Sequence, residues 1–159
     1  MATLIPAVVV FALLAQDIAM PPPAFSGNWT MDQARSDSVV REPGEFVVIT
    51  VTPADGTLKI DKRHGDQSEV TTYTIEAAPA GPAVIGAGAR RAYWDGKRLV
   101  TEGSGNVQGQ TVSIREVRTL NASGTEMTVE TMVMVQHGYT FRGAQNYAVG
   151  KDVYTRSAR

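Results

Sequence analysis

The 159-residue chain contains no cysteine. This absence excludes disulfide bonds, thiolate catalysis and zinc or iron–sulfur centres held by cysteine. Histidine is scarce as well, because His64 and His137 are the only two, so a histidine-based catalytic triad or a histidine-rich metal site is hard to build. The fold must therefore rest on its core and its strand ladder, and we expect no catalytic residues, no metal ligands and no cofactor.

An excess of charge of either sign is also missing. Lys and Arg number 15 and Asp and Glu number 16, which leaves a formal net charge of −1. No positive field favours nucleic acid or an anionic membrane surface, so we expect no nucleic-acid partner. The length and the 43% hydrophobic content suit one domain with a sizeable core.

Long apolar runs are absent except at the N-terminus. The run from Leu4 to Ala15 has the length of a signal-peptide core and is shorter than the about 20 residues that cross a bilayer. Cleavage after Ala15 or Ala19 would follow the small-residue rule. No Lys or Arg precedes the run, so either the amino terminus supplies the charge or a basic stretch lies upstream. The alternative is an N-terminal helix packed on the domain.

From this run we predict the domain organisation. Residues 1–19 are predicted to be a signal peptide, residues 20–24 a stiff proline-rich spacer, and residues 25–159 the folded domain. The mature protein is then expected in the periplasm or outside the cell, with no stable membrane insertion after cleavage. Its oligomeric state does not follow from the sequence.

From Phe25 onward hydrophobic residues recur with period two, which indicates β-strands rather than helices. Short Gly- and Asp-rich turns such as Asp95-Gly96-Lys97 separate the strand-like segments and indicate hairpins. The only helical candidate lies between Asp32 and Val39, and it could equally be an irregular link. The predicted strands are Phe25–Met31, Phe46–Val51, Thr57–Lys62, Val70–Ile75, Arg90–Trp94, Arg98–Glu102, Thr111–Leu120, Thr125–Val135 and Asn146–Arg156.

Sequential hairpins of this kind favour an all-β fold, a single antiparallel up-and-down β-barrel of about eight strands. Closure removes the exposed strand edges that would otherwise aggregate. The interior of such a barrel is either filled by side chains or holds one small ligand.

Two weaker patterns have ordinary structural explanations. Val84–Ala89 begins like a dinucleotide-binding fingerprint, but Arg91 occupies the third glycine position and no strand–helix–strand unit surrounds it. It is better interpreted as the loop Ala77–Gly88, which could act as a lid. Met132, Met134 and His137 could offer soft ligands to Cu(I), although methionines on one strand face are more often packing residues.

The tripeptide Gly27-Asn28-Trp29 opens the first predicted strand. A buried Trp29 would contribute on the order of 4–6 kcal/mol from about 150–250 Å² of buried surface, as an upper bound. Gly27 allows another segment to approach the strand closely. Arg156 in the last strand could stack on the indole. These features indicate a structural role rather than a ligand site.

The same residues resemble the Gly-x-Trp motif of lipocalins and the wider calycin group. In that family the tryptophan closes one end of the barrel and a basic residue from the last strand lies across it. Residues 25–30 and 93–100, together with the hairpin that contains Glu116, Gly124 and Met127–Glu130, look like small exported bacterial lipocalin-like proteins of poorly defined function. The resemblance implies a lipocalin-like barrel and binding of a small ligand.

The direction of one strand's side chains is left open by the sequence. Glu116 and Arg118 alternate with Ile114 and Leu120, so they could point into the barrel as a charged pair. A shift of one residue would instead place Arg115, Val117 and Thr119 inside, because successive side chains in a strand point to opposite faces.

The leading functional hypothesis is an exported, non-catalytic protein that binds a small apolar or amphipathic molecule, as the resemblance implies. The alternative is a barrel with a filled core that acts in the envelope through its surface, and an enzyme is disfavoured because no nucleophile–base set is visible. Residues chosen by alternation as ligand contacts are Tyr73, Trp94, Leu99, Ile114, Glu116, Arg118, Met127 and Val129.

Overall fold

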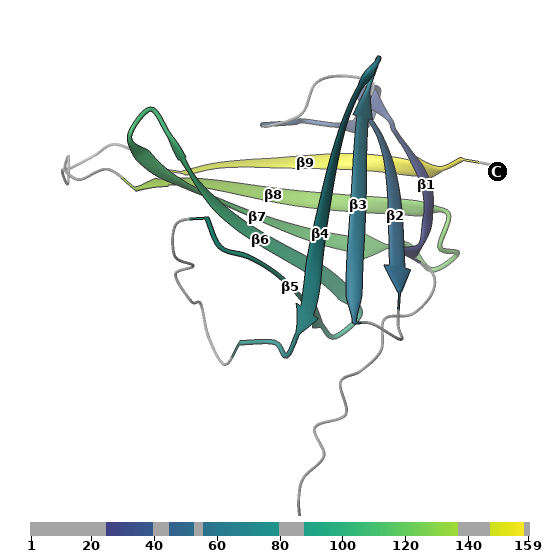
Figure 1. Cartoon of the computed structure of the whole chain (residues 1–159). Helices are drawn as coiled ribbons and strands as arrows, with labels where there is room; N and C mark the ends of the chain where they lie inside the picture. Colours follow the sequence, from purple (N-terminus) through teal and green to yellow (C-terminus); the bar gives the residue numbers. More distant parts are fainter. Residues whose placement is uncertain (1–24, 40–44, 53–55, 80–87, 137–146, 158–159) are drawn as a thin grey trace, which may run out of the picture.

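A computed structural model describes residues 25–39, 45–52, 56–79, 88–136 and 147–157. Within these ranges the chain forms nine strands and one short 3₁₀ turn, and the strands close into a barrel (Figure 1). The elements are β1 (Gly27–Met31), η2 (Gln33–Arg35), β2 (Phe46–Thr52), β3 (Thr57–His64), β4 (Gln67–Glu76), β5 (Arg90–Asp95), β6 (Arg98–Val107), β7 (Gln110–Leu120), β8 (Glu126–Gln136) and β9 (Tyr147–Arg156).

The all-β class and the closed barrel agree with the sequence prediction, but the strand count is nine rather than about eight. Strands follow one another around the barrel in chain order, and β1 pairs with β9 to close it. In a closed ring with an odd number of strands, the strand directions cannot alternate at every neighbouring pair. One neighbouring pair must therefore be parallel, and this pair is β4 and β5.

The expectation of a wholly antiparallel, up-and-down barrel is accordingly wrong at this one seam. The parallel contact consists of two register pairs, Ile75 with Ala92 and Glu76 with Tyr93. A parallel pair cannot be joined by a tight hairpin, because the chain must return toward the first end before the next strand begins. The long connection after Glu76, which the sequence indicates by its Ala, Gly and Pro content, provides that return.

Tight turns elsewhere have the residues that their geometry needs. Gly96, between β5 and β6, has φ of 59°, a left-handed conformation that glycine adopts at no steric cost. The β7–β8 turn is held by Asn121, whose side-chain oxygen accepts the backbone N–H groups of Thr125 and Glu126 at 3.0 and 3.1 Å. The helical candidate between Asp32 and Val39 reduces to the single turn η2, with Asp32 capping Ala34 N–H at 3.2 Å.

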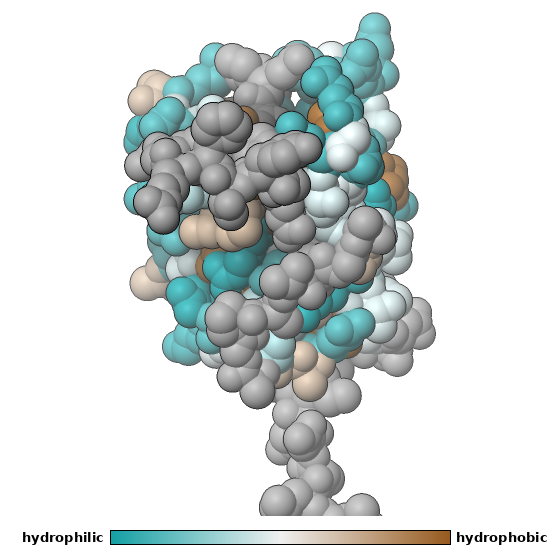
Figure 2. Space-filling view, turned by 90° about the vertical axis from the view of Figure 1, so that its left-hand side faces the viewer, coloured by the Kyte–Doolittle hydropathy of each residue, from teal (hydrophilic) through white to brown (hydrophobic). Residues whose placement is uncertain are grey.

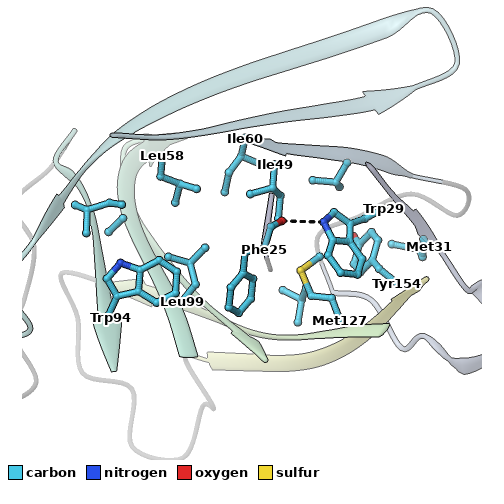
Figure 3. Packing of buried hydrophobic residues seen from close by; sticks show 14 residues of the cluster. Phe25, Trp29, Met31, Ile49, Leu58, Ile60, Trp94, Leu99, Met127 and Tyr154 are labelled. Carbon is cyan, nitrogen blue, oxygen red and sulfur yellow. Dashed lines mark hydrogen bonds between the residues drawn. The ribbon is translucent and has the colours of Figure 1, made fainter. Parts of the chain in front are cut away.

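The hydrophobic core fills the end of the barrel where β1 begins, which we call the closed end (Figure 3). Alternating residues of every strand from β1 to β9 except β7 supply it with buried side chains. The rings of Phe25 and Trp94 pack in a tilted arrangement with centroids 5.5 Å apart. The opposite end, which carries the β3–β4 and β6–β7 hairpins, is called the open end (Figure 1). Figure 2 shows a side of the molecule where hydrophilic residues predominate among those described.

Several sequence predictions fall outside the described ranges. The signal peptide, the spacer, residues 84–87 of the glycine-rich loop and His137 all lie there, so these remain predictions. Met132 and Met134 are described, and they are 39% and 45% exposed on the outer face of β8. They are therefore not the core-packing residues that the sequence favoured. Within the described ranges, no helix has the length and hydropathy needed to cross a membrane.

Candidate ligand-binding site

At the closed end, the barrel is plugged by Trp29. Its side chain is fully buried, and its Nε1 donates to the carbonyl of Phe25 at 3.1 Å (Figure 3). The guanidinium of Arg156 lies 4.2 Å from the ring centroid and donates to the carbonyls of Gly124 and Ser26, each at 2.9 Å. These bonds join the first and last strands to the β7–β8 turn, so this constellation closes the barrel and leaves no room for a ligand.

Gly27 is part of this plug for a steric reason. A Cβ placed on it would clash with Nη1 of Arg156, and its φ of 153° disfavours other residues. The glycine therefore permits the guanidinium to lie against the strand and over the Trp29 ring.

Four of the predicted ligand contacts belong to this packed half. Trp94, Leu99, Met127 and Val129 point inward and are between 0% and 9% exposed within the main core cluster. Trp94 Nε1 is buried and has no acceptor among the described residues. A buried donor of this kind costs about 1–3 kcal/mol unless a water or another group accepts from it. Whether these residues touch a ligand stays a prediction.

The next layer toward the open end is polar and centres on Glu116. The structure directs Glu116 and Arg118 into the barrel, where they are 5% and 2% exposed. Arg118 donates to Glu116 and, at 2.7 Å, to the hydroxyl of Thr101. Thr101 donates to Glu116 at 3.2 Å, and Lys62 reaches across from β3 to the same carboxylate at 3.4 Å. We call Lys62, Thr101, Glu116 and Arg118 the polar layer.

The opposite register is excluded by the contacts of the outer face. Val117 pairs there with Val100 and Tyr93 in a small separate cluster. Arg115 donates to Glu102 at 3.1 Å, beside bonds to the same carboxylate from Arg91 at 2.5 Å and from the hydroxyl of Tyr93 at 3.0 Å. Thr119 points to the same outer face as Arg115 and Val117 and is exposed. The polar groups on the outer face therefore bond to one another, and the residues of the polar layer face the interior.

Beyond the polar layer, the inward positions of β6, β7 and β8 that follow it are apolar or lack a side chain. Ile114 and Val112 on β7 and Val133 on β8 share the parity of Glu116 and are only partly covered. Gly105 on β6 pairs with Val112 and faces the same space. A Cβ on Gly105 would meet no heavy atom within 4 Å. The inward face of this half is therefore not packed as the closed end is.

Tyr73 lies between the two halves on β4. Burial raises the pKa of its phenol above the ordinary value of 10.0, and the nearby Glu116 carboxylate raises the pKa further. Arg118 and Arg90 act in the opposite direction. Tyr73 is therefore a neutral hydrogen-bonding group that borders the polar layer.

A small cavity adjoins the polar layer and is lined by residues of β2, β3, β7, β8 and β9 together with Glu45. Its volume of about 10 Å³ is enough for one water molecule and no more. Tyr154 lines it and donates to Glu45 at 2.7 Å. The full lining is Glu45, Val47, Lys62, Arg118, Met127, Val129 and Tyr154.

Sequence reasoning missed part of the polar layer. Lys62 shares the parity of Leu58 and Ile60, so its inward direction could have been found by extending their alternation by one step. Thr101 follows the same rule, two residues after Leu99. No comparable signal marks Glu45, whose burial depends on the hydroxyl of Tyr154 from a distant strand. Among the described residues, no cluster of acidic groups and histidines could hold a metal ion.

No protein-family model matches this chain, and no curated protein is similar to it in sequence. Solved structures with a loose likeness to it include the following three. A variant of the fluorescent protein UnaG is 13% identical with a TM-score of 0.47, covering 86% of this chain and 98% of its own. The REP1-NXSQ fatty acid transporter is 9% identical with a TM-score of 0.43, covering 87% and 99%.

The third structure is a secretary abundant heat soluble protein from Ramazzottius varieornatus. It is 9% identical with a TM-score of 0.42, covering 84% of this chain and 96% of its own. At such low identities and TM-scores the likeness carries no functional argument. Function has to be derived from the contacts of this chain itself.

Proposed function

We propose that this protein is an exported, non-catalytic barrel that binds one small amphipathic molecule in its open half. The observation that carries the proposal is the partly covered inward face beyond the polar layer, where Ile114, Val112 and Val133 lie beside the open space in front of Gly105. Binding sites for small molecules are concave and mostly apolar, with a few polar groups that fix orientation. This half of the barrel has both components.

The polar layer would meet the polar end of the ligand. Glu116 already accepts from Arg118, Thr101 and Lys62. Arg118 and Lys62 also line the water-sized cavity, so their remaining N–H groups can donate to a ligand oxygen or to a bridging water. The apolar part of the ligand would then extend toward the open end, against the partly covered aliphatic side chains.

Two substitutions at neighbouring residues, whose side chains point to opposite faces of β7, test this placement. Ile114→Trp puts a bulky side chain into the open half, whereas Ser113→Trp puts the same side chain on the outer face. We expect the unsubstituted protein and Ser113→Trp to bind an apolar fluorescent probe saturably, with competition by lipids extracted from the source cells. Ile114→Trp should weaken probe binding by roughly tenfold or more, about 1.4 kcal/mol, while thermal unfolding stays cooperative.

The second candidate function is a filled barrel that acts through its surface. The packed closed half and the cavity of about 10 Å³ favour it. It predicts that no probe binds saturably to the unsubstituted protein and that Ile114→Trp changes nothing. Equal affinity of Ile114→Trp and Ser113→Trp would likewise contradict binding in the open half.

Export rests on a separate observation, the apolar run from Leu4 to Ala15 that precedes the barrel. Mass spectrometry of the protein purified from its source tests it directly. We expect a mature N-terminus that begins after Ala15 or Ala19. An intact Met1 would contradict a cleaved signal peptide without affecting the binding proposal.

A further inference from the structure

Strand β8 changes character halfway along its length. In the closed half its outward side chains are polar, namely Glu126, Thr128 and Glu130. Toward the open end the run Met132–Val135 is apolar on both faces. A strand with one face in water alternates between apolar and polar residues, whereas a strand buried on both faces is apolar throughout. The open half of β8 therefore has the pattern of a strand that is covered on its outside as well.

The neighbouring strand β9 changes at the same level. Glu130 faces Lys151 across the two strands, and the next two outward pairs toward the open end are apolar. Each of these apolar residues is between 39% and 55% exposed. The two strands lie side by side (Figure 1), so the exposed side chains form one continuous area, which we call the outer patch. The outer patch consists of Met132, Met134, Tyr147 and Val149.

The size of the outer patch argues against a second protein as its occupant. Four side chains that are about half exposed present on the order of 400 Å². Each partner in a stable complex of two proteins contributes about 800 Å². A lipid surface sets no such minimum, because binding there scales with the apolar area that enters the boundary between head groups and acyl chains. Tyrosine is also enriched at this boundary, which suits Tyr147.

The charges beside the outer patch decide which lipid surface it suits. Glu130 and Lys151 face each other at its edge, so their charges are opposite. On the β7 side, Arg115 faces Met132 and donates to Glu102 at 3.1 Å. Both of these cations therefore stand beside an acid, and they offer little attraction to anionic lipids. A bilayer of zwitterionic lipids matches this balance of charge.

We propose that the outer patch docks this protein reversibly on the surface of a zwitterionic lipid bilayer, with its four side chains in the head-group region. The patch side chains already point outward, so the barrel wall stays closed on docking. Docking depends on apolar contact rather than on net charge. It does not require a bound ligand, although it would bring the open half close to a source of amphipathic molecules.

The absence of cysteine allows one fluorophore to report from the edge of the patch. Ser113→Cys, opposite Met134 on β7, carries a nitrobenzoxadiazole label there without removing a patch residue. Thr72→Cys carries the same label at an exposed outer position of β4. Phosphatidylcholine vesicles should brighten the label at residue 113 and shift it to shorter wavelength, and should leave the label at residue 72 unchanged. The readout is local, so contact through the apolar run Leu4 to Ala15 alone would not produce this difference.

Substitutions in the patch measure the strength of docking. Met132→Gln combined with Met134→Gln should raise the lipid concentration at half-saturation of the residue-113 signal by roughly tenfold. Val70→Gln is the matched control, because it removes an apolar side chain that is 51% exposed on the outer face of β4, and it should leave half-saturation unchanged. Added salt or anionic phosphatidylglycerol should also change it little.

Several outcomes would overturn the docking. An unchanged signal at residue 113, or equal half-saturation for the double variant and Val70→Gln, would contradict it directly. Binding to anionic vesicles alone, lost at high salt, would point to an electrostatic surface instead. A label already shifted before lipid is added would mean that a second copy or another segment of this chain covers the patch. None of these outcomes bears on probe binding in the open half, which Ile114→Trp tests separately.

Discussion

Trp29 is the residue on which the closed end depends most. It is fully buried, bonded to Phe25 and covered by Arg156. Trp29→Ala should lower the free energy of unfolding by about 3–5 kcal/mol, because it removes buried surface and leaves a cavity. Urea unfolding measures the effect. Val70→Ala, at a position 51% exposed on the outer face, serves as the control and should change stability by less than about 0.5 kcal/mol. Equal urea midpoints for the two variants would contradict the role of Trp29 in closing this end of the barrel.

Tyr73 gives the stability of the barrel a dependence on alkaline pH. Its pKa in the folded protein is raised above 10.0, first by burial and then by Glu116. The folded state therefore favours the protonated phenol. The resulting stabilisation is fully present below pH 10.0 and is lost as the pH rises through the higher pKa of the folded state.

Tyr73→Phe cannot ionise, so the variant should lose less stability than the unsubstituted protein between neutral pH and the region above pH 10.0. Thermal unfolding across that range measures the difference. Tyr147→Phe, at a residue 53% exposed on β9, is the matched control and should follow the unsubstituted protein. Parallel pH profiles for Tyr73→Phe and the unsubstituted protein would show that the phenol is not held in its neutral form.

Among the elements, β7 decides what the interior can recognise. Its period of two was readable from the sequence, and so were its limits within one residue. Its direction was not, because a slip of one residue turns every side chain to the other face without changing the pattern. Contacts from other strands settle it, above all Lys62 on β3 and Thr101 on β6 around Glu116.

A double-mutant comparison tests whether the inward pair on β7 acts as a unit. Arg118→Met alone should destabilise the barrel by about 3–5 kcal/mol, because it takes a partner from a buried carboxylate. Arg118→Met combined with Glu116→Gln removes both charges at similar volume and should recover most of that loss, which urea unfolding would show. A double variant as unstable as the sum of the two single variants would mean that the groups do not interact.

For the whole molecule, the sequence predicted that the strands close into a barrel, but it did not predict that one neighbouring pair of strands is parallel. Period-two segments and turn residues such as Gly96 identify strands locally, so the all-β class followed from them. The parallel pair follows only from the strand count, since an odd ring must contain one. A local pattern cannot reveal this property, because it depends on every strand at once. The polar contacts that join distant strands, such as Glu45 with Tyr154, are hidden for the same reason.

The uneven pairing around the ring predicts how local stability is distributed. Amides in β7 and β8, which share ten register pairs, should exchange with solvent only through global unfolding. On β4, amides that bond to β3 should be protected, whereas the alternate amides between Gln67 and Thr74, which face away from β3, should exchange orders of magnitude faster. Native-state hydrogen exchange followed by NMR resolves the two sets within one strand. Equal protection of both sets on β4 would contradict this distribution of local stability.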